Sequence, residues 1–279
     1  MMPSLAERLG YGADEKLLIV NCDDLGSSAS ANRATEAALA AGVARSATLM
    51  VPCPWALDGV AKAAGCGIGV HLTLTCEYPG YRWRALTGAA SLHDAQGYMP
   101  ATAQAVWDNA DLDEVRAECR AQIDRAYAWG VDVTHLDAHM GAMQIDPRFF
   151  AAFVDLAAEY DLPLRMFGSG AERRLGFPGR AQAAERGLVF PDHLLTTWGA
   201  PAKETFAGIL RDLRPGVTEI YVHPVEDGPE LRGYDPDHPQ IRVDDLALLT
   251  DPELPALVAA AGARLISFAP LRELQRARA

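Results

Sequence analysis

Two adjacent carboxylates, Asp23 and Asp24, are the residues of this chain best suited to chemistry. They follow an apolar run at residues 17–20 that is typical of a strand buried on both faces, and Gly26 permits a turn directly after them. Active-site groups of α/β barrels lie at such carboxyl ends of strands. A helix cap would explain one acid but not two. Because adjacent strand residues point to opposite faces, we expect the strand to end at Asp23 so that both acids share one site.

His135, Asp137 and His139 form a second group, with a spacing of two residues. In an extended strand they would share one face, and two histidines with a carboxylate describe a metal site that leaves positions open for water and substrate. Such a metal polarises a carbonyl and lowers the pKa of its water, so a spare carboxylate could be the general base and a histidine the general acid. A structural zinc site, the alternative, normally has four protein ligands, usually cysteines, and the five cysteines here are not clustered.

Short apolar runs alternate with helical patterns along the chain and must position these groups. This βαβ alternation indicates a parallel sheet. The length of 279 residues and the lack of a Gly-x-Gly-x-x-Gly turn favour an α/β fold of the distorted TIM-like (β/α) barrel type over a dinucleotide-binding sheet. We predict about seven parallel strands, at residues 17–20, 47–51, 67–74, 133–137, 164–167, 217–224 and 264–268.

The polar residues with chemical potential fall in or just after the later part of these strands. In a parallel barrel those ends converge on one rim, so residues far apart in the sequence become neighbours. A single histidine in a strand is more often a hydrogen-bonded core residue than a ligand, but this many placements together favour a shared site. The residues are Asp23, Asp24, His71, His135, Asp137, His139, Arg165 and His223.

Three segments interrupt the alternation. Residues 76–111 contain many glycines, prolines and aromatic residues, and we expect either a folded insertion near the mouth of the site or a surface excursion that buries its tryptophans. Residues 168–195 show no regular pattern, and the polar residues 226–240 resemble a lid or rim. No linker divides the chain, so we expect a single domain over residues 1–279 with loop insertions at the carboxyl-terminal rim.

The composition, 49% hydrophobic and 22% charged, is that of an ordinary soluble globular protein. The net charge of −12 argues against nucleic acid and against an anionic membrane surface as partners. No apolar run approaches the roughly 20 residues that span a bilayer, and the polar N-terminal stretch lacks a signal-peptide core. Five cysteines without a Cys-x-x-Cys pair are typical of a reduced chain, so we expect a cytoplasmic location.

The chain also carries a series of ordered motifs: Asn-Cys-Asp-Asp-Leu-Gly at 21–26, Asn-Arg at 32–33, Thr-Leu-Met at 48–50, Gly-Val-His-Leu-Thr-Leu-Thr at 69–75, Thr-His-Leu-Asp-Ala-His at 134–139 and Glu-Ile-Tyr-Val-His-Pro at 219–224. With Arg242 and the helical pattern after it, these motifs resemble those of the YdjC-like carbohydrate deacetylases. This group is also called the chitooligosaccharide deacetylase or hopanoid-associated deacetylase family. The resemblance runs over residues 17–271.

The resemblance implies a distorted TIM-like barrel, and a metal-dependent hydrolase that removes N-acetyl groups from an amino sugar or oligosaccharide. By position in the motifs, Asp24, His71 and His139 would bind the metal. Asp23 would be the general base on a metal-activated water, and His223 would be the general acid that protonates the departing amine.

Three further residues receive roles from the resemblance. Arg165 matches the family's arginine near the site and would hold Asp23 in place. His135 and Asp137 belong to a ligand-bearing motif, and we expect them behind the ligands or on the substrate. The cofactor would be one divalent metal ion, zinc or magnesium first, with cobalt and manganese also permitted by mixed nitrogen and oxygen ligation.

The chain departs from the family pattern at four places, none of them a proposed ligand. Cys22 replaces a usual alanine and Leu25 a usual phenylalanine, and Val225 stands where glycine is common. Residues 140–141 are Met-Gly where the family often has polar residues and another histidine. The chemistry therefore looks intact, whereas the substrate contacts differ.

Two other functions fit the same barrel. One is a metal-dependent hydrolase of a phosphoester or a non-sugar amide, although phosphate recognition predicts an Arg/Lys cluster and residues 226–240 are acidic instead. The other is a non-catalytic carbohydrate-binding barrel, which would have lost Asp23 or His223. The expected partner is a small-molecule or oligosaccharide substrate, and the oligomeric state stays open, with a homodimer as one option. Tyr81, Trp83, Trp107 and Tyr234 are candidates for stacking against a sugar, but we expect each of them to be a packing residue and do not include them in the site.

Overall fold

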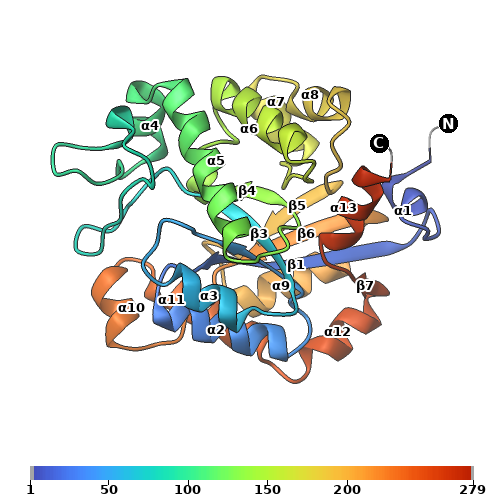
Figure 1. Cartoon of the computed structure of the whole chain (residues 1–279). Helices are drawn as coiled ribbons and strands as arrows, with labels where there is room; N and C mark the ends of the chain where they lie inside the picture. Colours follow the sequence, from blue (N-terminus) through green and yellow to red (C-terminus); the bar gives the residue numbers. More distant parts are fainter. Residues whose placement is uncertain (1–2, 278–279) are drawn as a thin grey trace.

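A parallel β-sheet with helices packed around it forms the centre of the molecule (Figure 1). The computed structural model describes residues 3–277. The strand order is β4-β3-β2-β1-β6-β5, and β7 pairs with the first residues of β1. The strands are β1 Lys16–Leu25, β2 Ser46–Leu49, β3 Gly67–Leu72, β4 Leu136–Ala138, β5 His193–Thr196, β6 Gly216–Val222 and β7 Ala263–Leu265.

Helices follow most strands and cover the sheet from outside (Figure 1). In Figure 1, α2, α3, α11 and α12 lie below the strands, and α5 to α8 lie above them. None of the helices within residues 3–277 is both long and apolar enough to cross a bilayer. The helices are α1 Leu5–Arg8, α2 Ala29–Ala40, α3 Ala56–Lys62, η1 Ala90–Leu92, α4 Ala103–Asn109, α5 Leu112–Ala128, η2 His139–Gly141, α6 Pro147–Glu159, α7 Ser169–Leu175, α8 Gly179–Glu185, α9 Ala202–Arg211, α10 Pro229–Tyr234, α11 Pro239–Leu249, α12 Leu254–Ala260 and α13 Ala269–Arg276.

Strand β1 is the central strand of the sheet, because it pairs with three other strands. Its first half is bonded to β6 and β7, and its second half to β2. Residues 17–20 are fully buried, as the continuous apolar run predicted. The all-parallel sheet with outer helices confirms the predicted α/β fold of the distorted TIM-like type.

The fifth predicted strand is wrong in its position. Residues 164–167 form only a single bridge, between Leu164 and Leu136, whereas the true β5 lies at His193–Thr196 in the segment for which we predicted no regular structure. Strand β5 is short and only half-buried, so it lacks the apolar run that marks the other strands. The barrel is distorted here, because Leu136 N donates to Pro163 O (3.0 Å) and Leu164 N to Val189 O (3.2 Å) without a continuous ladder.

The predicted insertion at 76–111 packs against α5 and contains η1 and α4. Its attachment is a buried carboxylate: Glu118 accepts hydrogen bonds from Leu86 N (3.0 Å), Thr87 N (2.9 Å) and Thr87 Oγ1 (2.7 Å). Residues 226–240, predicted as a polar loop, instead contain α10 and the first residues of α11. Both segments lie near the carboxyl ends of the strands, where they contribute to the walls of a pocket.

Candidate metal centre

Asp23 and Asp24 both line one pocket because β1 is irregular at its end. The register of β1 against β2 shifts between Cys22 and Leu25, and Asp24 has φ 63°, a left-handed conformation that is uncommon outside glycine. We expected the strand to end at Asp23, but it continues to Leu25. The bulge turns the second carboxylate toward the same side as the first, and this local strain is typical of a functional position.

The pocket has a volume of about 820 Å³ and opens at the carboxyl ends of the strands. Its floor is polar, and its walls come from residues 77–79, the segment after β4, α7, the turn after β5 and residues 234–238. Six of the eight predicted site residues line it, whereas His135 and Asp137 do not. The six are Asp23, Asp24, His71, His139, Arg165 and His223.

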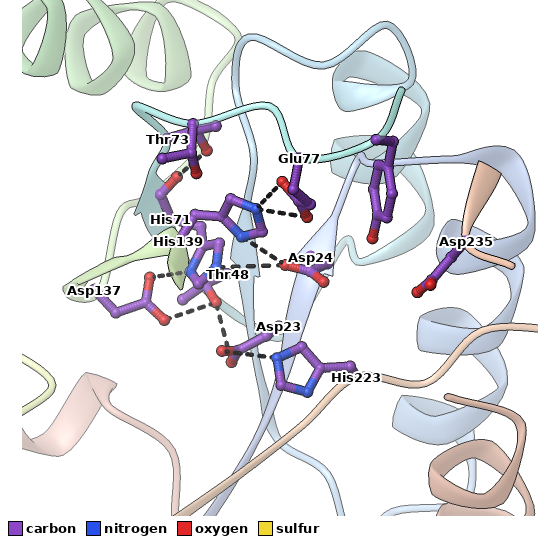
Figure 2. A network of polar contacts seen from close by, with 12 residues as sticks. Asp23, Asp24, Thr48, His71, Thr73, Glu77, Asp137, His139, His223 and Asp235 are labelled. Atoms are coloured by element: carbon purple, nitrogen blue, oxygen red, sulfur yellow. Dashed lines mark hydrogen bonds and ion pairs between the residues drawn. The ribbon is translucent and has the colours of Figure 1, made fainter. Parts of the chain in front are cut away.

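Three of these residues converge like ligands of one cation. Asp24 Oδ1 lies 3.4 Å from His71 Nε2 and 3.2 Å from His139 Nδ1, and one donor atom from each residue lies within 4.8 Å of the other two. Figure 2 shows Asp24 joined to both rings. Asp24 Oδ1 is buried and has no hydrogen-bond partner within residues 3–277. An orphaned carboxylate oxygen between two imidazole nitrogens fits a divalent metal with open coordination positions.

Each of the three has a charged partner on the side away from the others. His71 Nδ1 lies 2.7 Å from Asp137 Oδ1, and His139 Nε2 lies 3.0 Å from Glu77 Oε2 (Figure 2). Arg242 Nη1 donates to Asp24 Oδ2 at 2.8 Å. Carboxylates behind metal-binding histidines set the tautomer and the ring orientation, so these partners prepare the donor atoms for a metal.

The electrostatics of this cluster attract positive charge. Burial lowers the pKa of both histidines, but Asp137 and Asp24 raise the pKa of His71 to about 9, and Glu77 and Asp24 raise that of His139 to about 10. Although burial opposes it, the two rings and Arg242 hold the pKa of Asp24 well below its usual value. The carboxylates thus favour the protonated form of both rings, and a metal bound by these nitrogens would displace protons.

Asp23 is held by one arginine. Arg165 Nη1 donates to Asp23 Oδ2 and Nη2 donates to Asp23 Oδ1, both at 2.6 Å, and Asn21 Nδ2 donates to Oδ1 at 2.9 Å. Arg165 also contacts Asp137 (2.8 Å) and Glu219 (2.7 Å). Asp23, His71 and Asp137 form a second group with metal-like spacing, but the guanidinium of Arg165 already supplies its positive charge. Of the two groups, Asp24, His71 and His139 are therefore the better candidates to hold a metal ion.

His223 lies across the pocket, where its ring packs against the rings of Trp198 and Tyr221. Its Nε2 is 3.8 Å from Asp23 Oδ2, its Nδ1 has no hydrogen-bond partner in the described part of the chain, and its side chain is 14% exposed. Burial lowers the pKa of His223, against the opposing effect of Asp24 and Asp23. The backbone N–H of His223 donates to the buried Asp245 at 2.8 Å, which fixes the backbone position of the residue.

His135 lies outside the pocket. Its ring stacks on Phe268 at 3.6 Å, its Nδ1 lies 2.9 Å from Thr134 Oγ1, and burial lowers its pKa to about 3. The metal site predicted from the spacing of His135, Asp137 and His139 is therefore wrong. Strand residues four apart are separated by about 13 Å, too far to bind one cation. Asp137 instead supports His71, and His139 lies beyond the end of β4.

Sequence reasoning missed several residues that complete the site. Glu77 lies six residues after His71, inside the predicted insertion, and no pattern distinguishes it from a surface acid. Arg242 was noted only as part of a motif, and Asp245 three residues later is its neighbour on the same helix. An arginine and an aspartate three residues apart on a helix look like a surface pair in the sequence, and only the structure shows that both are buried.

The predicted sugar-stacking residues mostly pack inside the protein. Trp83 Nε1 donates to Thr75 O (2.9 Å), Trp107 Nε1 to Ala142 O (2.8 Å) and Tyr81 OH to Ser27 O (2.6 Å). Only Tyr234 lines the pocket, and it is 6% exposed. The aromatic residues of the insertion therefore stabilise the wall of the pocket rather than its open surface.

Comparison with known proteins identifies the family of this chain. The profile of the YdjC-like protein family matches residues 17–260. A carbohydrate deacetylase of Thermus thermophilus is 37% identical over 266 residues, which cover 91% of this chain and 94% of that protein. A chitooligosaccharide deacetylase of Yersinia pestis (strain Pestoides F) is 30% identical over 273 residues, with coverage of 91% and 98%.

A solved structure has the same fold. It is that of a protein from Enterococcus faecalis V583 described as a proposed cellobiose-phosphate cleavage protein, with a TM-score of 0.81 and 25% identity. The match covers 92% of this chain and 99% of the other. The family profile and the relatives span nearly the whole chain, so the resemblance seen in the motifs is confirmed. This chain belongs to the YdjC-like protein family.

Proposed function

We propose that this protein is a metal-dependent carbohydrate N-deacetylase, a hydrolase that removes the acetyl group from an acetylated amino sugar or oligosaccharide. The observation that carries the proposal is the orphaned Oδ1 of Asp24 between His71 and His139, with the restrained carboxylate of Asp23 beside it. The names of the relatives, carbohydrate deacetylase and chitooligosaccharide deacetylase, support the substrate class.

Asp24, His71 and His139 would hold one divalent ion, zinc or magnesium first, with cobalt and manganese as alternatives. Such an ion supplies Lewis acidity toward the acetamide carbonyl. The protein's part is to hold the three donor atoms in place through Asp137, Glu77 and Arg242.

Asp23 is the general base of the proposed reaction. It accepts a proton from the water that attacks the acetamide carbon, and the bidentate contact with Arg165 keeps its oxygens in one orientation. Asn21 donates to the same carboxylate, so the base cannot rotate away from the cluster. These contacts spare the reaction the cost of orienting the base.

His223 is the general acid. It lies near Asp23 and donates a proton to the amine nitrogen as the carbon–nitrogen bond breaks. A carbon–oxygen bond from water replaces that bond, so the products are acetate and the free amino sugar. No hydrogen bond within residues 3–277 occupies Nδ1 of His223, so the ring can exchange protons through that atom.

The remaining expectations are part of the same proposal. The protein acts as a single barrel domain over residues 1–279 with an insertion at about 76–111, in the cytoplasm, on a small-molecule or oligosaccharide substrate and not on nucleic acid. The acidic chain, with a net charge of −12, supports the exclusion of nucleic acid.

Acetate release tests the proposal. The wild-type protein, loaded in turn with each candidate metal, is assayed on a panel of N-acetylated amino sugars with and without a chelator. We expect release that the chelator abolishes and the metal restores. Turnover that is insensitive to the chelator would refute the metal mechanism, and full activity of Asp23→Asn would remove Asp23 as the base.

A further inference from the structure

The turn after β5 is fixed against the end of β6 by one buried carboxylate. Asp245, on α11, accepts a hydrogen bond from Thr197 Oγ1 at 2.6 Å and one from the backbone N–H of His223 at 2.8 Å. Trp198 N donates to Thr196 Oγ1 at 3.1 Å, which closes the turn. Trp198 is therefore held at a defined place beside His223.

The ring of Trp198 lies at the edge of the active-site pocket. Its centroid is 4.7 Å from that of His223, with an angle of 67° between the rings, and 5.8 Å from that of His238. The guanidinium carbon of Arg242 lies 5.2 Å from the same indole. These contacts leave 37% of the residue exposed, and Trp198 is part of the pocket lining.

The other aromatic side chains of the pocket are less available. Tyr78 is 8% exposed and its hydroxyl accepts from Arg242, Tyr234 is 6% exposed, and Phe167 is 7% exposed. Tyr221 is half-buried, with Arg165 over its ring. Among the pocket-lining tryptophan, tyrosine and phenylalanine residues described, Trp198 alone is exposed. A large aromatic surface kept open at the edge of a pocket is a candidate for ligand contact.

The chemistry of the amide decides which ligand group lies there. On the proposed function, the acetamide carbon lies beside Asp23 and the Asp24 cluster, and the amide nitrogen faces His223, the proton donor. The sugar ring is bonded to that nitrogen, whereas the acetyl methyl group lies on the other side of the carbonyl carbon. The ring therefore extends from His223 toward its neighbour Trp198.

We propose that Trp198 is the surface on which the sugar ring bearing the acetamido group stacks, and that it selects pyranose rings over acetamides without a ring. This inference rests on the proposed function for the orientation of the amide. The apolar C–H face of a pyranose can cover the exposed part of the indole. His238 and Asp237, exposed on the same rim, are within the pocket lining and can hydrogen-bond to the hydroxyls at the ring's edge.

Binding without turnover tests the contact directly. Metal-loaded protein with Asp23→Asn is titrated calorimetrically with an N-acetylated chitooligosaccharide, alone and with Trp198→Ala, Trp198→Phe or Trp55→Ala added. Trp55 is the matched control, because it is 41% exposed and lies outside the pocket lining. We expect Trp198→Ala to raise Kd roughly tenfold, and Trp198→Phe and Trp55→Ala to stay within about threefold.

Steady-state kinetics separate a substrate contact from an effect on His223. With Asp23 intact, Trp198→Ala should raise KM for the sugar and leave kcat/KM for N-acetylethanolamine, which has no ring, unchanged. An equal loss on both substrates, or a sugar Kd within twofold of that of the Trp55→Ala variant, would overturn the inference. If Trp198→Ala weakens sugar binding but the wild type releases no acetate, Trp198 is confirmed as a sugar contact and the proposed deacetylase activity is refuted.

Discussion

The two halves of the site are built differently. In the metal half, the proposed ligands Asp24, His71 and His139, each residue has its own ionised partner. In the proton-transfer half, the proposed base Asp23 and acid His223, Asp23 is held by Arg165 and Asn21, but Nδ1 of His223 has no hydrogen bond within residues 3–277. The donor atoms of a metal must be in place before it binds, whereas a general acid must follow a nitrogen that moves during the reaction.

The neighbours Asp23 and Asp24 show how little sequence separates the two halves. Asp23 is paired with Arg165 from the irregular segment after α6, and Asp24 with Arg242 from α11. The bulge in β1 and the left-handed backbone of Asp24 allow two consecutive carboxylates to face two different arginines. Two neighbouring residues therefore have different proposed roles, Asp24 in metal binding and Asp23 in proton transfer.

Removal of a metal-half ligand should have the largest effect. His71→Ala removes one of three donors, so we expect the purified protein to retain no stoichiometric metal and to release no detectable acetate. Metal content by atomic emission and acetate release are the measurements. His93→Ala, in the insertion and outside the pocket lining, is the control and should retain both. Full metal content in His71→Ala would assign the ligands to other residues.

Removal of the proposed base should lower activity without changing metal content. Asp23→Asn should lower kcat by about 10²–10⁴, the contribution of general base catalysis, and should leave metal content unchanged, because Asp23 is not among the three proposed ligands. His223→Ala should behave in the same way. Steady-state kinetics and metal analysis of the same preparations check this. Loss of the metal from the Asp23→Asn variant would show that Asp23 is also needed for metal binding.

The partners of the metal half should have an intermediate effect. Glu77→Gln removes the charge that supports His139, so we expect metal affinity to fall by about 10–100-fold. Competition with a chromogenic chelator gives the affinity. Glu36→Gln, which loses a surface contact with Lys62 at 2.8 Å, is the matched control and should not change it. An unchanged affinity in Glu77→Gln would show that His139 needs no partner.

The smallest effect is expected next to the site but outside both halves. Ser28 caps α2, since its Oγ accepts from Ala31 N at 3.0 Å, four residues after Asp24. Ser28→Ala should reduce the free energy of unfolding by about 1 kcal/mol, measured by denaturant titration. Activity per folded molecule should stay within twofold of the wild type. A loss of metal affinity in Ser28→Ala would instead show that this helix cap helps to position the proposed metal ligands.

The strand ends could be predicted because their signals are local. The apolar run at 17–20, the histidine at 71 and the histidine-proline pair at 223–224 are visible without the fold, and six of the eight predicted residues line one pocket. Strand β5 was missed because a short, half-buried strand carries no apolar run. Trp198 lies in the turn directly after β5. Because the strand was not predicted, its carboxyl end and the residues that follow it were not considered for the site.

The sequence alone determined the α/β class, the family and the residue types available for a single metal and a proton-transfer pair, because motifs and periodicity depend on near neighbours in the chain. Only the tertiary structure decided which buried histidine lines the pocket and which packs away from it. His139 reaches Asp24 because it lies past the end of β4, while His135, four residues earlier, stacks on Phe268. The tertiary structure also brought Glu77 and Arg242 to the proposed ligands. Contacts between residues tens or hundreds of positions apart leave no trace in local spacing.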